Sequence, residues 1–207
     1  YQDLLRISVA SAGNDHRLGA NEAPPAIISV FLGDELTGIL KAIEHGETYD
    51  AQGRVKMEIG VNVLPPIPKD TTDRNRTSPF AFTGNKFEFR MLGSAISIAC
   101  PNIMINTIVA DTLCQFADRL ENASSFPDEL NSLIKETIIQ HKRIVFNGDG
   151  YSDDWQKEAE RRGLLNLKTT VDCLPYYIKQ KNIDLFARHG IYTETEVNSR
   201  CEIILGT

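Results

Sequence analysis

The first residues of the chain have the apolar spacing of the end of a helix. Leu4, Leu5, Ile7 and Val9 are apolar, and we expect the helix to stop near Gly13.

A second helix is predicted to begin at the double proline of residues 24–25, because a missing N–H costs least at the first helical position. Gly46 is a suitable C-terminal stop. Apolar residues between these points recur every three or four positions: Ile27, Ile28, Phe31, Leu32, Leu36, Ile39, Leu40 and Ile43.

Two later runs alternate instead, as half-buried strands do. The first, "RVKMEIGVNVLPP", has Val55, Met57, Ile59, Val61 and Val63 on one face. A loop rich in proline and polar residues separates it from the second, "KFEFRM" at residues 86–91.

From Asn102 onward the pattern is mostly helical. Ser152 is a candidate N-cap and Gly163 a candidate stop for a charged helix over residues 153–162, whose charges we expect to face solvent, and Thr193 and Glu196 have capping-box spacing. Two apolar stripes are predicted, one with Ile105, Ile108, Val109, Leu113, Phe116 and Leu120, the other with Leu130, Leu133, Ile134, Thr137, Ile138 and Val145.

The order of these segments predicts an α+β fold, with a few antiparallel strands followed by a mostly helical C-terminal region. We divide the chain at residue 110, with the strands and charged loops in residues 1–110 and the helical region in residues 111–207.

Composition narrows the possible partners. The net charge of -6 argues against nucleic acid, which requires a basic surface, and no apolar run approaches the length of a membrane span. The four cysteines show no metal-ligand spacing, and we expect Cys114 to be a buried, reduced thiol in a cytoplasmic protein. The chain begins without methionine, so we expect it to be a piece of a longer protein.

The candidate chemistry begins with the strand "KFEFRM". Because side chains alternate along a strand, Lys86, Glu88 and Arg90 form a row of cation, carboxylate and cation on one face. Such a row could bind a divalent metal through Glu88 and anionic oxygens through its cations. A solvent-facing strand with internal ion pairs explains the same pattern.

Two loops add charges of the same kind. "NDHRLGANEAPP" holds Arg17 and Glu22 around Gly19 and Ala20, and "DRNRTSPF" carries Arg76 beside hydroxyl groups. Arginine presents a rigid set of donors suited to phosphate or carboxylate. The P-loop, GxGxxG, HExxH and GxSxG motifs are absent from the sequence.

These segments together resemble glutamine synthetase, most closely its type III form. The resemblance rests on "NDHRLGANEAPP", "DRNRTSPFAFTGNKFEFRMLGS" and "IACPNIMINTIVA". It implies part of the catalytic domain followed by the type III helical region. It also implies a glutamate–ammonia ligase that forms glutamine through γ-glutamyl phosphate.

The resemblance also assigns roles to residues. Glu22 matches the flap glutamate, which covers the substrate and accepts a proton from ammonium. Arg17 and Arg90 match arginines that bind substrate, Arg76 matches an arginine at the phosphoryl and glutamate site, and Glu88 matches a metal ligand. The mobile Gly19–Ala20 segment would then let Glu22 move as a lid.

Two positions depart from the type I enzymes of the family. Lys86 stands where they have an arginine, and we assign it, with Arg76, to ATP binding. The second arginine of their motif falls near Ala81, so another residue must replace it.

The resemblance implies Mg²⁺ or Mn²⁺ and the substrates glutamate, ammonia and ATP, within a large homo-oligomeric ring. We expect the 207-residue chain alone to be inactive, since one metal ligand holds a cation poorly. Two alternatives are a non-catalytic oligomerisation module and a phosphotransferase like the phosphagen kinases.

Overall fold

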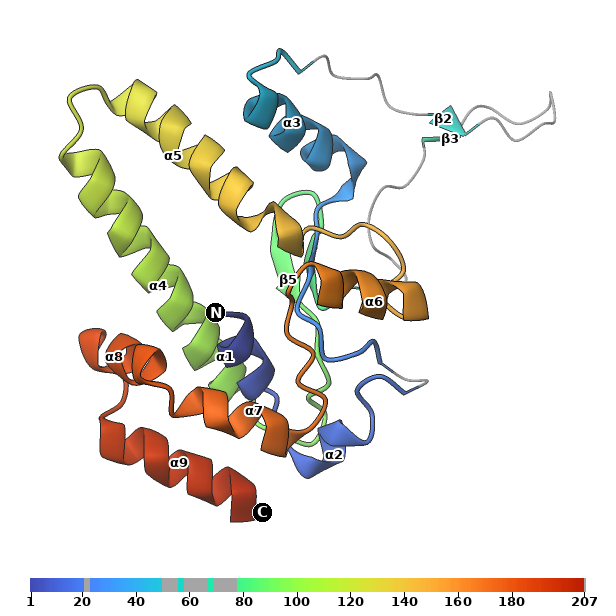
Figure 1. The fold of residues 1–207 in the computed structure, drawn as a ribbon, viewed down its shortest axis with the longest axis vertical. Helices are drawn as coiled ribbons and strands as arrows, with labels where there is room; N and C mark the ends of the chain where they lie inside the picture. Colours follow the sequence, from blue (N-terminus) through green and yellow to red (C-terminus); the bar gives the residue numbers. More distant parts are fainter. Residues whose placement is uncertain (21–22, 50–55, 58–66, 69–77, 207) are drawn as a thin grey trace.

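The computed structural model describes residues 1–20, 23–49, 56–57, 67–68 and 78–206 (Figure 1). The helices are α1 (Gln2–Ile7), α2 (Ala12–Asp15), α3 (Gly33–His45), α4 (Ala99–Glu121), α5 (Phe126–His141), α6 (Asp153–Arg161), α7 (Thr170–Tyr177), α8 (Gln180–Arg188) and α9 (Glu194–Gly206), with a 3₁₀ turn η1 (Lys142–Ile144). The strands are β1 (Val30–Phe31), β2 (Lys56–Met57), β3 (Ile67–Pro68), β4 (Phe80–Phe82) and β5 (Phe87–Phe89).

The strands form a small sheet in the order β1-β4-β5 and a separate antiparallel pair, β2-β3. Strands β4 and β5 are antiparallel, whereas β1 runs parallel to β4. With helices from α4 to α9 following the strands, the predicted α+β class is confirmed. Most of the predicted strand over residues 55–63 lies outside the described residues, and β2 is its described part.

The helix predicted from the double proline begins later than expected, at Gly33. Residues 26–32 are mostly buried, and within them Val30 and Phe31 pair with Phe80 and Ala81 as a parallel strand. Burial on both faces makes such a strand continuously apolar, so its residues also fit a helical period. The stop at Gly46 is confirmed, because this residue is left-handed with φ of 73°.

The N-terminal helix also differs from the prediction. It ends at Ile7, and Gly13 lies inside the short helix α2 instead of acting as a stop. The physical reason is Ser11, whose side chain accepts a hydrogen bond from the Asn14 N–H and so starts a new helix.

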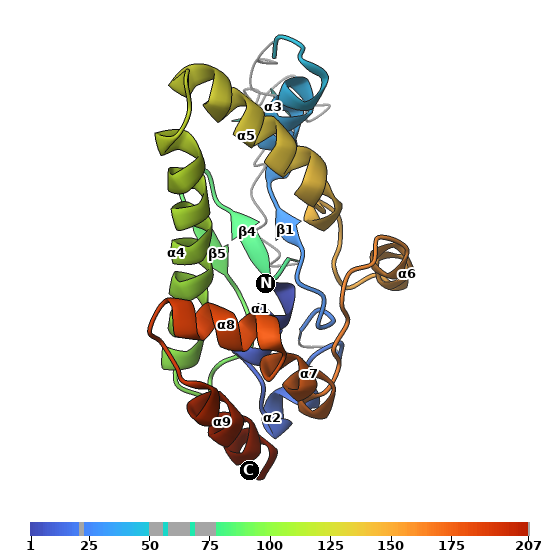
Figure 2. The same cartoon turned by 60° about the vertical axis from the view of Figure 1, so that its left-hand side comes forward.

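The main hydrophobic core joins the two ends of the chain. Leu4 and Ile7 of α1 pack with residues of α7, α8 and α9, among them Phe186, which is fully buried. Figure 2 shows these C-terminal helices gathered at one end of the molecule. The division at residue 110 stays a prediction, and this core contains residues from both sides of it.

A second core lies under α6. Trp155 stacks on Phe146 with ring centroids 3.8 Å apart, and Ala159 is buried beside them. The capping prediction is confirmed, since Ser152 accepts a hydrogen bond from the Trp155 N–H and Gly163 has φ of 67°. Most other side chains of this helix are exposed or half-buried, as expected of a charged helix.

The apolar stripe predicted along α4 is only partly correct. Val109 and Leu113 are 48% and 59% exposed, and Cys114 is exposed rather than buried. The face that packs inward carries Met104, Thr107 and Asp111. A polar network around Asp111 allows this carboxylate to be buried, so hydrophobicity alone did not identify all of the face that packs inward.

No helix in the described part of the chain is long and apolar enough to cross a membrane.

Candidate active site

The candidate site is built on the hairpin of β4 and β5. Gly84, with φ of 95°, lies in the turn, and the Thr83 N–H donates to the Lys86 carbonyl oxygen over 2.9 Å. A left-handed glycine at this place gives a tight turn the twist that antiparallel strands need. The local sequence therefore positions β5 directly after β4.

The register of the sheet sets the direction of each side chain. Glu88 pairs with Ala81, whereas Phe87 pairs with Phe82 and Phe89 with Phe80. Paired residues share a face of the sheet, so the phenylalanines lie on one face and Glu88 lies on the other. The alternation predicted for "KFEFRM" is confirmed.

The predicted row of charges forms two ion pairs. Lys86 Nζ lies 3.3 Å from Glu88 Oε1, and Arg90 Nη2 lies 3.0 Å from Glu88 Oε2. Hydrogen bonds from Arg90 and Lys86 lower the pKa of Glu88, which keeps the carboxylate ionised at neutral pH. The exposed fraction of the side chain falls from 65% at Lys86 to 20% at Arg90, so the row begins in solvent and ends at a partly buried residue.

An ionised carboxylate is a ligand that Mg²⁺ prefers, and Glu88 fits that role. However, no three His, Cys, Asp or Glu side chains among the described residues gather into a metal site. A cation with about six ligands needs more than this one carboxylate. A metal bound at Glu88 would therefore need further ligands from outside the described residues.

The glycine-containing loop is closed at its base. The Gly19 N–H donates to the Pro24 carbonyl oxygen over 3.1 Å, and Gly19 adopts a left-handed φ of 77°. Pro25 and Ala23 are buried on the far side of the loop. Glu22, the predicted lid carboxylate, lies outside the described residues.

Arg17 reaches the chain segment that follows β5. Its Nη1 lies 3.4 Å from Ser94 Oγ, and Asn14 Nδ2 donates to the Leu92 carbonyl oxygen over 3.1 Å. These bonds join the base of the loop to residues just beyond Arg90. Of the predicted site residues, the structure brings together Lys86, Glu88 and Arg90, and it ties Arg17 to the next segment; Arg76 lies outside the described residues.

Along its whole length the chain is similar to known proteins. It is 51% identical to the type-3 glutamine synthetase of Dictyostelium discoideum, 50% to a glutamine synthetase of Butyrivibrio fibrisolvens and 44% to one of Bacteroides fragilis. Residues 129–207 match the glutamine synthetase C-terminal domain. The chain is similar in sequence to one segment of these glutamine synthetases. Each alignment covers 99% of this chain but only 28–29% of the related glutamine synthetase.

Sequence reasoning missed two groups of charged residues in this chain. One surrounds the buried carboxylate of Asp111, to which Arg188 and His189 bind. The other lines a cavity near Arg143 and Arg162. The signal for the first was an acidic residue seven positions after the buried Met104, which places both on one helix face. The charged residues of the second group come from separate helices, so no local sequence pattern could have predicted that they lie together.

Proposed function

We propose that the protein carrying this chain is a glutamate–ammonia ligase. The supporting observation is the Lys86–Glu88–Arg90 row, ordered on β5 in a chain 44–51% identical to proteins named glutamine synthetase. A row of this kind offers one metal ligand flanked by two cations, which suits a reaction that transfers a phosphoryl group.

In the proposed reaction, the γ-carboxylate of glutamate attacks the γ-phosphorus of ATP and forms an acyl phosphate, releasing ADP. Ammonia then attacks the acyl carbon and displaces phosphate to give glutamine. Arg17, Arg76 and Arg90 bind glutamate and phosphoryl oxygens. Glu22 closes over the site, excludes water and accepts a proton from ammonium.

ATP contacts are assigned to Arg76 and Lys86. Glu88 supplies one ligand to Mg²⁺ or Mn²⁺, whose charge, when the metal is bound, offsets that of the phosphates. The other ligands come from outside the described residues. A cytoplasmic location and a large homo-oligomeric ring complete the proposal.

The first test is glutamine formation by the intact protein and by its Glu88→Gln variant. The substitution keeps the size of the side chain and removes its charge, so we expect activity to fall on the order of 100-fold, as for loss of one strong electrostatic contact in a transition state. Glu160→Gln, an exposed position on α6, is the matched control and should keep full activity. Full activity of Glu88→Gln would refute the assignment.

The second test separates the alternatives. Glutamate-dependent phosphate release is measured with and without ammonia. A ligase releases phosphate with glutamine in equal amounts when ammonia is present, whereas a phosphagen-kinase-like enzyme accumulates a stable phosphorylated product. An oligomerisation module gives neither signal. We expect the isolated 207-residue chain to be inactive with Mg²⁺ or Mn²⁺, and turnover by it would refute that part of the proposal.

A further inference from the structure

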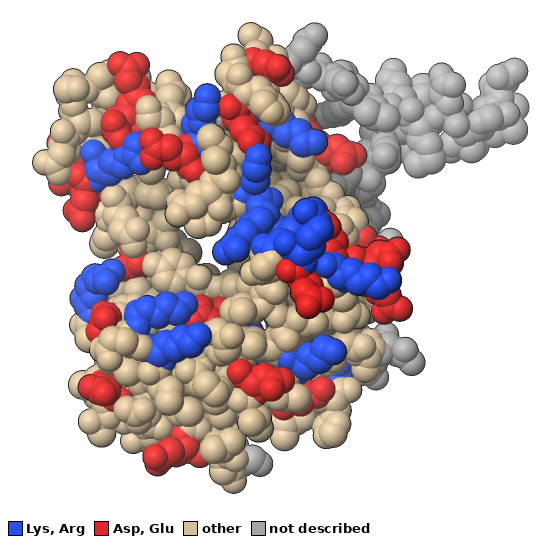
Figure 3. Space-filling model, viewed as in Figure 1, with Lys and Arg blue, Asp and Glu red and all other residues tan. Residues whose placement is uncertain are grey.

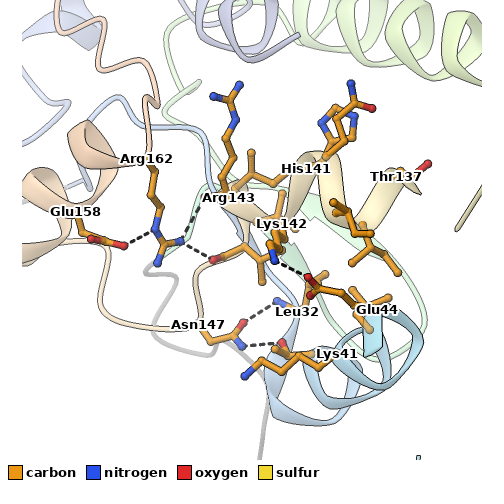
Figure 4. Close-up of a pocket in the computed structure, with 18 of the residues that line it drawn as sticks. Leu32, Lys41, Glu44, Thr137, His141, Lys142, Arg143, Asn147, Glu158 and Arg162 are labelled. Atoms are coloured by element: carbon orange, nitrogen blue, oxygen red, sulfur yellow. Dashed lines mark hydrogen bonds and ion pairs between the residues drawn. The ribbon is translucent and has the colours of Figure 1, made fainter. Parts of the chain in front are cut away.

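A cavity of about 810 Å³ lies among α3, α5, η1, β1 and α6 (Figure 4). Its walls are mainly apolar and include Val30, Leu40, Ile138, Ile144 and Val145. Pockets for small ligands usually enclose 300–1,000 Å³ and have such walls with a few polar groups. The cavity therefore has the size and lining of a binding site.

The cavity lies on the face of the sheet opposite Glu88. Val30 and Phe87 both line it. Val30 pairs with Phe80, which pairs with Phe89, and Phe87 lies two residues from Phe89 on the same strand, so all four share one face. The cavity thus has lining groups of its own, separate from the row on β5.

Cations dominate the rim of the cavity. Lys41, Lys142, Arg143, Arg161 and Arg162 line it, against two carboxylates, Glu44 and Glu158. The whole chain has the opposite balance, with a net charge of -6. Figure 3 shows Lys and Arg side chains concentrated in the middle of this face of the molecule. Local charge and apolar walls together suit a ligand that is both anionic and apolar.

The two carboxylates are already occupied. Glu44 accepts from Lys142 Nζ over 2.5 Å, and Glu158 binds both Arg161 and Arg162 at 2.6–2.7 Å. The hydrogen bonds from Arg161 and Arg162 lower the pKa of Glu158 to about 2. The carboxylates are therefore not available to neutralise further cations.

Two rim cations have no such partner. No carboxylate in the described part of the chain pairs with Lys41 or Arg143, and Figure 4 shows both side chains extending without a marked contact. Both residues are exposed. An incoming anion can thus meet them without first breaking an ion pair.

We propose that this cavity binds a small organic anion that has an apolar body and a carboxylate, sulfonate or phosphate group. The body lies against the aliphatic walls, and the anionic group contacts one of the two rim cations, Lys41 or Arg143. Arginine suits this role because its planar donors match the oxygens of such groups. This binding is independent of the proposed ligase activity.

The test uses two fluorescent probes with the 207-residue chain. 1-Anilinonaphthalene-8-sulfonate carries the aromatic body and a sulfonate, and N-phenyl-1-naphthylamine has the same body without the charge. Dissociation constants are measured for each probe at low and high salt. We expect salt to weaken binding of the sulfonate probe and to leave binding of the neutral probe nearly unchanged.

The deciding variant is Lys41→Gln combined with Arg143→Gln. Because each exposed ion pair contributes up to about 1 kcal/mol, we expect the sulfonate probe to bind roughly five-fold more weakly and the neutral probe less than about two-fold more weakly. Lys157→Gln, an exposed lysine on α6, is the control and should change neither.

Circular dichroism checks that each variant is folded, and we expect all of them to be folded because the substituted side chains are exposed. An unchanged affinity of the double variant for the sulfonate probe would overturn the proposal. Equal weakening for both probes would overturn it too, because the anionic group would then make no specific contact at the rim.

Discussion

Asp111 provides the sharpest test of how this fold is held together. It lies on α4 with 2% of its side chain exposed. Arg188 Nη1 lies 2.6 Å and His189 Nε2 lies 2.9 Å from its Oδ1, and its Oδ2 accepts from the Tyr1 hydroxyl and Gln115. One carboxylate thus joins α4 to the end of α8 and to the first residue of the chain.

The perturbation is Asp111→Asn, which keeps the shape of the side chain and removes its charge. The amide also replaces one acceptor oxygen with a donor that faces other donors. Burial alone would raise the pKa of Asp111, but hydrogen bonds from Tyr1, His189 and Arg188 outweigh it and lower the pKa to about 2. From an ordinary value of 3.8, this shift corresponds to about 2 kcal/mol of folding free energy.

The sign of the pH dependence follows from that shift. A carboxyl group whose pKa is lower in the folded state stabilises the fold when both states are ionised, which is above pH 3.8 here. The stabilisation is lost as the pH falls from 3.8 towards about 2. The difference between the wild type and Asp111→Asn should therefore be full near pH 7 and shrink through that acid range.

The assay is thermal and urea unfolding followed by far-ultraviolet circular dichroism. A loss of about 2 kcal/mol should lower Tm by roughly 4–8 °C in a chain of this size. Asp118→Asn, an exposed position on the same helix, is the control and should stay within about 0.5 kcal/mol of wild type. A neutral effect of Asp111→Asn, or an effect that does not decline with acid, would refute the reasoning.

Two further predictions concern the main core and the cysteines. Phe186 is fully buried between the rings of Tyr177 and Tyr192, so Phe186→Ala should lower the free energy of unfolding by about 3–5 kcal/mol. Val171→Ala, at a 64% exposed position, should leave it nearly unchanged. Urea unfolding measures both variants. Cys114 is exposed and should react quickly with iodoacetamide, whereas Cys173 is buried and burial raises its thiol pKa to about 11, so it should react only on unfolding. Mass spectrometry of the labelled peptides checks this order, and early labelling of Cys173 would contradict the buried core.

The features predicted correctly depend on groups a few residues apart. Ser152 caps α6, and in the capping box before α9 the Thr193 N–H donates to Glu196 while the Glu196 N–H donates to Thr193 Oγ1. Gly46 and Gly163 take the left-handed conformations that end helices. Each of these contacts forms within one turn of chain, so the local sequence contains all of the information.

The segment before α3 shows where local pattern is insufficient. Residues 26–32 are apolar enough for either a buried helix or a buried strand. Pairing with β4, about fifty residues later, makes Val30 and Phe31 a strand, and the spacing of apolar residues along the chain does not contain that contact. The inward face of α4 was decided in the same way, because Arg188 and His189 make the burial of Asp111 possible.

In the candidate site, too, some features follow from the local sequence and others from the tertiary structure. The sequence by itself determined that Lys86, Glu88 and Arg90 share one face of a strand, because alternation is a property of the extended backbone. It also carries the similarity to glutamine synthetases, through segments that keep their residues in order. Only the tertiary structure decided that Arg17 meets Ser94 and that cations from α3, α6 and η1 surround one cavity, since these groups become neighbours only when the chain folds.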